Sequence, residues 1–126
     1  SKLASIVYAE AEHADEMPTN AGLYINRLKK GMKLESDPTI IFAENDFTIH
    51  RVLTRQLSVD SPYNTYRHAG LPPGPICNPG VAALKATAHP KIINYLFYVW
   101  SPKLKHHLFA TNYAQHLHNV RLVKGQ

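Results

Sequence analysis

The sequence lacks the features that define several common protein classes. Cys77 is the single cysteine, so the chain has neither a disulfide framework nor a cysteine metal cluster. The longest apolar stretch, residues 92–100, contains Asn94 and is far shorter than the roughly 20 residues that span a bilayer. The chain begins at Ser1 without a basic-then-apolar leader, so we expect it to be mature or excised from a longer protein.

Cofactor and nucleophile motifs are also missing. No G-x-S-x-G, S-x-x-K, G-x-G-x-x-G or phosphate-binding loop occurs, so we expect no cofactor.

The histidines lack metal-ligand spacing. His106 and His107 would face opposite sides of a strand, and His116 and His118 lie about 200° apart on a helix. We therefore expect no metal site.

The composition fits one globular domain. Of 126 residues, 44% are hydrophobic and 18% are charged, which suits a single core. The net charge of +5 is compatible with an acidic polymer as partner. The lysines and arginines are scattered, however, and this distribution does not predict nucleic-acid binding.

Hydrophobic periodicity and capping residues predict helices in the first third of the chain. One helix is expected over residues 3–14, and a second starts near residues 18–20 and stops at Gly31. A serine, an aspartate and a proline then predict a short helix over residues 38–43. Residues 48–53 read as a strand or an extended arm.

The sequence after residue 53 predicts a long loop, followed by a helix, a hairpin and a last helix. Residues 58–80 hold five of the nine prolines but also four large apolar or aromatic residues, which indicates a packed, shaped loop. Asn78 and Pro79 should cap a helix over residues 80–88. Strands over residues 95–100 and 106–110 should form a hairpin. A helix capped by Thr111 or Asn112 follows, with an apolar stripe of Tyr113, Leu117 and Val120. This order predicts a small α+β domain.

Glu10 is the most informative single residue. It follows Leu3, Ile6 and Val7 on the apolar stripe of the first helix, where partial burial would raise its pKa toward the range of a general acid. The alternative is a rim carboxylate paired with a lysine or arginine. Glu12, with the neighbouring acids Asp15 and Glu16, is expected to face water.

The loop tyrosines Tyr63 and Tyr66 lie close to amide and hydroxyl side chains. Aromatic rings beside such groups suit the apolar faces and polar rims of sugars. The alternative is that both tyrosines anchor the loop to the core.

Six segments, in the same order along the chain, resemble the YceG-like (MltG) endolytic murein transglycosylases. They are residues 4–10 (ASIVYAE), 25–28 (INRL), 36–41 (SDPTII), 61–66 (SPYNTY), 70–80 (GLPPGPICNPG) and 107–111 (HLFAT). They cover nearly the whole chain, which is therefore identified as the catalytic domain, residues 1–126, of such a protein. The family usually has glutamate where Tyr8 stands, threonine where Ala11 stands, and a Glu-His pair where Gln115 and His116 stand.

The resemblance implies cleavage of the β-1,4 bond between N-acetylmuramic acid and N-acetylglucosamine within peptidoglycan strands, leaving 1,6-anhydro ends. Glu10 matches the catalytic glutamate and would act as the single general acid and base, whereas an ordinary glycosidase needs two carboxylates. The positions that match family motifs, and are expected to bind substrate, are Asn26, Asp37, Thr39, Tyr63, Asn64, Thr65 and His107.

The resemblance also implies a setting. It implies an N-terminal membrane anchor and a LysM-like subdomain, both absent from these residues, and a location at the inner membrane facing the periplasm or cell wall. Peptidoglycan synthases are expected partners, and we expect a monomer. Because of Tyr8 and Ala11, the alternative function is a non-catalytic peptidoglycan-binding module. A nucleic-acid-binding function rests on the charge alone.

Overall fold

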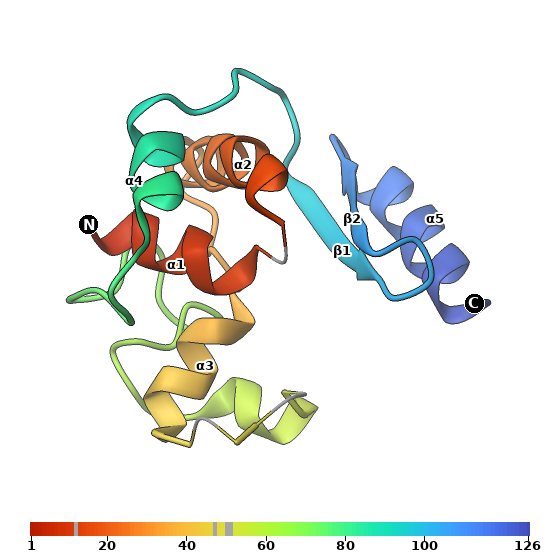
Figure 1. The fold of residues 1–126 in the computed structure, drawn as a ribbon. Coiled ribbons are helices and arrows are strands. Elements are labelled where there is room, and N and C mark those ends of the chain that lie inside the picture. The colour runs from red at the N-terminus through yellow and green to blue at the C-terminus, as the bar shows by residue number, and fades with distance from the viewer. Residues whose placement is uncertain (12, 47, 50–51) are drawn as a thin grey trace.

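The computed structural model describes residues 1–11, 13–46, 48–49 and 52–126, which form an α+β domain, as the sequence predicted. The elements in chain order are α1 (Lys2–Glu10), η1 (Ala14–Glu16), α2 (Met17–Lys29), α3 (Asp37–Glu44), η2 (Thr54–Ser58), α4 (Val81–Ala88), β1 (Phe97–Ser101), β2 (His106–Ala110) and α5 (Tyr113–Lys124). Figure 1 shows the hairpin and α5 to one side of the helical part, with β1 nearest to α2.

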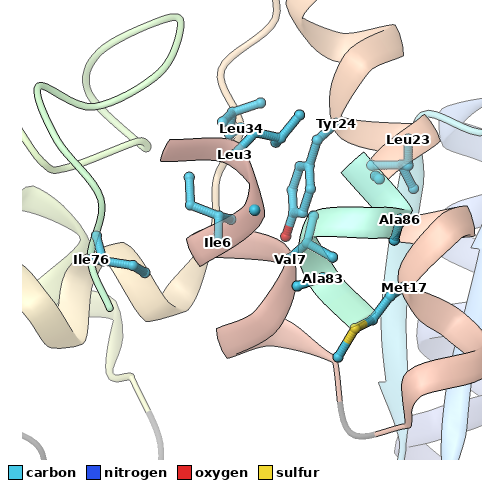
Figure 2. Packing of buried hydrophobic residues seen from close by; sticks show 12 residues of the cluster. Leu3, Ile6, Val7, Met17, Leu23, Tyr24, Leu34, Ile76, Ala83 and Ala86 are labelled. Atoms are coloured by element: carbon cyan, nitrogen blue, oxygen red, sulfur yellow. The ribbon is translucent and has the colours of Figure 1, made fainter. Parts of the chain in front are cut away.

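The hydrophobic core lies among α1, α2 and α4. Leu3, Ile6 and Val7 of α1 meet Tyr24 of α2 and Ala83 of α4, and all five are buried (Figure 2). Full burial of each large aliphatic side chain contributes roughly 1.5–3 kcal/mol. This core fixes the axis of α1 and therefore the position of Glu10 at its C-terminal end.

The segment after η2 is an ordered loop without helix or strand, as its prolines and glycines predicted. The backbone N–H of Ile76 donates to the buried Ser5 hydroxyl over 3.0 Å, and the Cys77 thiol donates to the Ser5 carbonyl. The Asn64 amide donates to two backbone carbonyls upstream in the chain. Hydrogen bonds therefore hold the loop to α1 near residues 76–77 and to η2 and the residue after it through Asn64.

The hairpin is antiparallel and pairs Phe97 with Ala110 and Ser101 with His106 at its two ends. Three side chains of α2 hold the hairpin and the segment leading into it. The Asn26 amide donates to two backbone carbonyls of that segment, the Arg27 Nε donates to the carbonyl of Leu96, and the Tyr24 and Tyr98 hydroxyls are 2.8 Å apart.

The first helix is shorter than predicted. It ends at Glu10, and Ala11 adopts an extended backbone. Beyond this point His13 bonds the Lys105 carbonyl and Glu16 bonds His107, so contacts with the hairpin replace further helical turns. Tertiary contacts of this kind commonly override a local helical period.

Three other predictions need correction or qualification. No strand forms at residues 48–49 or 52–53, while His50 and Arg51 lie outside the described residues, as does Glu12. Gly80, rather than Asn78 or Pro79, is the N-cap of α4. Tyr113 begins α5 but is largely exposed, and Asn112 caps that helix by accepting the Gln115 N–H.

Candidate active site

A pocket of ≈ 410 Å³ opens where the end of α1 meets the hairpin. Its lining residues are Glu10, Arg27, Leu34, Glu35, Asp37, Tyr66, Phe97, Tyr98, Val99, Trp100, Tyr113 and His116. Hollows of similar volume elsewhere differ in chemistry: the one beside Asn26, Lys29 and Lys30 has no carboxylate among its lining residues. The pocket at Glu10 combines three carboxylates with a row of aromatic rings, as a polar ligand with apolar faces requires.

Glu10 is the last residue of α1, and its side chain is 15% exposed. Its Oε1 lies 3.1 Å from the Nε2 of His107, which β2 supplies from the other end of the chain. The carboxyl is therefore within the pocket wall, with a titratable ring behind it. This partial burial agrees with the position on the apolar stripe of the first helix that the sequence predicted for Glu10.

His107 is held between two acids. Its side chain is 1% exposed, and its ring meets those of Tyr98 and Trp100 edge-on. Glu16 accepts the His107 backbone N–H over 2.8 Å and faces the ring Nδ1 at 2.5 Å. Burial lowers the pKa of His107, but hydrogen bonds and charge from Glu10 and Glu16 outweigh it, so the pKa is raised overall.

Two further acids, Asp37 and Glu35, line the same pocket. Asp37 is the first residue of α3, where the helix dipole favours a negative charge, and it accepts the Tyr66 hydroxyl over 2.6 Å. Burial and this bond to Asp37 raise the pKa of Tyr66. Glu35 has a left-handed backbone (φ 51°), which costs a non-glycine residue about 1 kcal/mol, and pairs with Arg27 at 3.5 Å.

The hairpin and α5 supply an aromatic wall. Phe97 stacks on His116 with ring centres 5.2 Å apart. The guanidinium carbon of Arg27 lies over the same Phe97 ring, 5.3 Å from its centre. Burial and the charge of Arg27 lower the pKa of His116. Burial and the charge of Glu10 raise the pKa of Tyr98. Both rings are thus uncharged at neutral pH and offer flat, largely apolar surfaces.

The predicted site residues separate into three groups. Glu10 and Asp37 line the pocket, and His107 lies behind it in contact with Glu10. Asn26 belongs to a different hollow, where its amide is bonded to the backbone before β1. Thr39, Tyr63, Asn64 and Thr65 form the third group and pack within or against the loop and α3.

Thr39, Asn64 and Thr65, which the sequence predicted to bind substrate, are buried in this structure. The Thr39 and Thr65 hydroxyls are 2.8 Å apart, and Thr65 Oγ1 accepts the Ser36 N–H just before α3. Tyr63 packs edge-on against Phe42. These contacts hold the loop and α3 in place, and Tyr63, unlike the other three residues, is only half-buried.

The structure also adds residues that the sequence did not single out. Glu16 was expected to face water but contacts His107, and no local pattern links positions 16 and 107. Arg27 follows the buried Tyr24 by three positions, so helical periodicity could have placed it on the inner face. Of the loop residues 61–80, Tyr66 alone lines the pocket, whereas the hairpin and α5 supply six of the lining residues.

Within the described ranges, the histidine, cysteine, aspartate and glutamate side chains form no cluster of three or more that could hold a metal ion. Among the same residues, every helix is too short or too polar to cross a membrane.

Several known proteins are similar to this chain in sequence, and one solved structure is similar in fold. A model of the YceG-like family matches residues 1–122. A Bacillus subtilis (strain 168) protein named endolytic murein transglycosylase is 41% identical over 97 residues, covering 77% of this chain and 27% of the relative. A protein of the same name from Streptococcus pneumoniae serotype 2 is 28% identical over 122 residues, covering 94% of this chain and 22% of the relative.

A crystal structure of a YceG-like protein from Listeria monocytogenes superimposes with a TM-score of 0.89 at 34% sequence identity. The match covers 93% of this chain and 38% of that one. The chain spans about a quarter of the length of the curated relatives described above. A family model matched almost end to end, together with a solved relative of the same fold, shows that this chain belongs to the YceG-like family.

Proposed function

We propose that this domain is an endolytic lytic transglycosylase that cuts peptidoglycan strands at the β-1,4 bond between N-acetylmuramic acid and N-acetylglucosamine. Glu10 would be its single general acid and base, and the product would carry a 1,6-anhydro end. Membership of the YceG-like family and relatives named endolytic murein transglycosylase support the reaction class. The observation that carries the assignment of Glu10 is its place in the pocket wall against His107.

The reaction needs one carboxyl in two protonation states. Glu10 first donates its proton to the glycosidic oxygen while the bond between that oxygen and the anomeric carbon breaks. As a carboxylate it then accepts the proton of the C6 hydroxyl, whose oxygen bonds to the anomeric carbon and closes the anhydro ring. The acetamido group of the substrate can stabilise the anomeric centre between these steps. No water is consumed, and Glu10 is protonated again at the end.

The pocket offers matching contacts for a glycan strand. Phe97, Trp100 and Tyr113 present ring faces or edges to the pocket, and such rings pack on the apolar faces of sugars. Asp37 and Tyr66 also line the pocket, and because the Tyr66 hydroxyl donates to Asp37, their oxygens remain as acceptors for sugar hydroxyl or acetamido N–H groups.

The cellular setting belongs to the same proposal. A domain that cuts peptidoglycan must reach the cell wall, which fits the inner membrane as its site and the periplasm or cell wall as the compartment it faces. Peptidoglycan synthases are the proposed partners and a monomer the proposed state. These points rest on the family resemblance.

A matched pair of variants tests the proposal. Purified peptidoglycan is digested with the wild-type chain, Glu10→Gln and Glu44→Gln, and the new ends are identified by mass spectrometry. Glu44 is exposed at the end of α3, so Glu44→Gln makes the same chemical change outside the pocket. We expect anhydro ends from the wild type and Glu44→Gln. Loss of a general acid should lower the rate about 10²–10⁴-fold in Glu10→Gln.

Two other outcomes would replace the proposal. Reducing muramic ends would indicate hydrolysis, for which Asp37 or Glu35 in the same pocket could supply the second carboxylate of an ordinary glycosidase. Sedimentation with sacculi in the absence of any new ends would indicate a peptidoglycan-binding module. Full activity of Glu10→Gln would disprove the mechanism.

A further inference from the structure

Glu16 has no part in the reaction proposed above, yet it makes the closest contact of the site. It belongs to η1 and is not among the pocket-lining residues, and its side chain is 11% exposed. One carboxylate oxygen accepts the backbone N–H of His107 over 2.8 Å, and the other faces Nδ1 of the same residue at 2.5 Å. Two-point contact fixes both the position of β2 and the rotation of the ring.

This contact determines which nitrogen carries the proton. An ionised carboxylate only accepts hydrogen bonds, so Nδ1 must be the donor toward Glu16. If the ring is neutral, Nε2 is then an acceptor, and the 3.1 Å contact requires that Glu10 donates. If the ring is charged, Nε2 donates to an ionised Glu10. In both arrangements one proton lies between Glu10 and Nε2 of His107, in addition to the proton on Nδ1.

The groups around His107 favour this state. The carboxyls of Glu10 from α1 and Glu16 from η1 face its two ring nitrogens, and the rings of Tyr98 and Trp100 from β1 and Phe109 from β2 surround it. The Tyr98 phenol stays neutral because burial raises its pKa. Glu16 is thus the negative charge that compensates the shared proton in a site with little access to water.

We propose that Glu16 is a positioning residue for the catalytic acid: it holds His107 with Nε2 toward Glu10 and retains one proton on the Glu10–His107 pair. This inference rests on the proposed role of Glu10 as general acid. It makes the first step of the reaction available at a pH where an exposed glutamate would have lost its proton.

The decisive variant is Glu16→Gln, which preserves the size of the side chain and removes its charge. Without that charge the shared proton is held less tightly, so the alkaline limb of kcat against pH should move about 1 unit to lower pH. Because Glu16 does not line the pocket, kcat at neutral pH should fall about tenfold or more while KM stays unchanged. Glu16→Asp, which restores the charge, should return the limb toward its original position.

Asp15→Asn is the matched control. Asp15 is the exposed acid next to Glu16 in the same short helix, so its removal changes the net charge equally. We expect the pH profile of Asp15→Asn to superimpose on that of the wild type. Circular dichroism checks that all variants fold. A purely structural role of Glu16 would lower activity at every pH without moving the limb, and that result would overturn the proposal.

A second readout does not depend on catalysis. Ring ¹⁵N NMR of His107 in the ligand-free chain should show a proton on Nδ1 in the wild type, and the ring should titrate at lower pH in Glu16→Gln. An unchanged tautomer and titration in Glu16→Gln would disprove the positioning role even if Glu10 proves to be catalytic. Conversely, if Glu10→Gln remains active, the proposed function fails, while the NMR result still decides whether Glu16 controls His107.

Discussion

Arg27 is expected to contribute more to stability than any exposed charge of the protein. Its guanidinium donates to the Leu96 carbonyl from Nε and to the Lys33 carbonyl from Nη1, both over 2.7 Å. The side chain is only 6% exposed, so water cannot readily replace these bonds. Arg27 therefore connects α2 both to the segment before β1 and to the loop before α3.

The cost of Arg27→Ala can be worked out from these contacts. Each hydrogen bond from a buried charged group contributes about 1.5–3 kcal/mol, and the cation over the Phe97 ring adds about 1 kcal/mol. The ion pair with the half-exposed Glu35 adds less than about 1 kcal/mol. Because the variant also avoids the cost of burying a charge, we expect a net loss near the lower end, about 3 kcal/mol.

Urea and thermal unfolding measure this loss. For a chain of this length, 3 kcal/mol corresponds to a decrease in Tm of about 10–15 °C. Arg67→Ala is the control, because Arg67 pairs with Asp60 at 3.6 Å with side chains 47% and 95% exposed, and it should cost less than about 1 kcal/mol. Arg27→Met keeps most of the volume and should lose almost as much as Arg27→Ala. If Arg27→Ala and Arg67→Ala are equally stable, the reasoning is refuted.

Three more predictions concern pH, close packing and a buried hydroxyl. Folding raises the pKa of His107, so protonation of this ring stabilises the fold fully below the unfolded-state pKa, and the effect disappears as pH rises through the folded-state pKa. In urea titrations, His107→Gln should therefore lower the free energy of unfolding more near pH 6 than near pH 9. Equal losses at the two pH values would contradict this prediction. Gly22→Ala should cost about 2–4 kcal/mol because its Cβ would lie 2.3 Å from the Lys91 carbonyl oxygen. Gly125→Ala, with its nearest atoms at 3.6 Å, should change stability by less than about 0.5 kcal/mol in the same denaturation assay. Thr65→Val should cost about 1–3 kcal/mol in urea unfolding, since it leaves a buried backbone N–H without its acceptor, and a neutral effect would argue against a structural role.

Local sequence signals were sufficient for most of the elements. Proline near the start of α3, Gly31 after α2 and Asn112 before α5 mark ends that the chain uses as predicted, because the conformations they favour are set by covalent structure and by the nearest backbone groups. The β-branched and aromatic residues over 95–100, followed by a turn, likewise predicted the hairpin. Helix α1 departs from its period at Glu10 because the residues after it bond a hairpin more than 80 positions away.

The site was predicted less completely than the fold. The stripe of α1 placed Glu10 correctly, since burial of one helical face follows from spacing alone. The motif positions Thr39 and Thr65 did not reveal their burial, because a buried hydroxyl that supports a loop and an exposed one that binds a sugar belong to the same residue type. The aromatic wall was missed because only the packing of α5 against the hairpin turns those rings into one surface.

The acids and the histidine of this site belong to opposite ends of the chain, separated by 97 and 91 positions. Bringing such distant positions together carries a loop-closure cost that local helix formation does not. Tyr24, Asn26 and Arg27 hold the hairpin and its lead-in, whereas α1 and η1 depend on the helical core. Partial opening that releases the hairpin would therefore disconnect the proton-sharing pair while most of the helix content persists. Activity should therefore depend on whether the hairpin stays attached to α2. Every treatment that lowers activity by partial opening should also raise the amide exchange rate in β1 and β2.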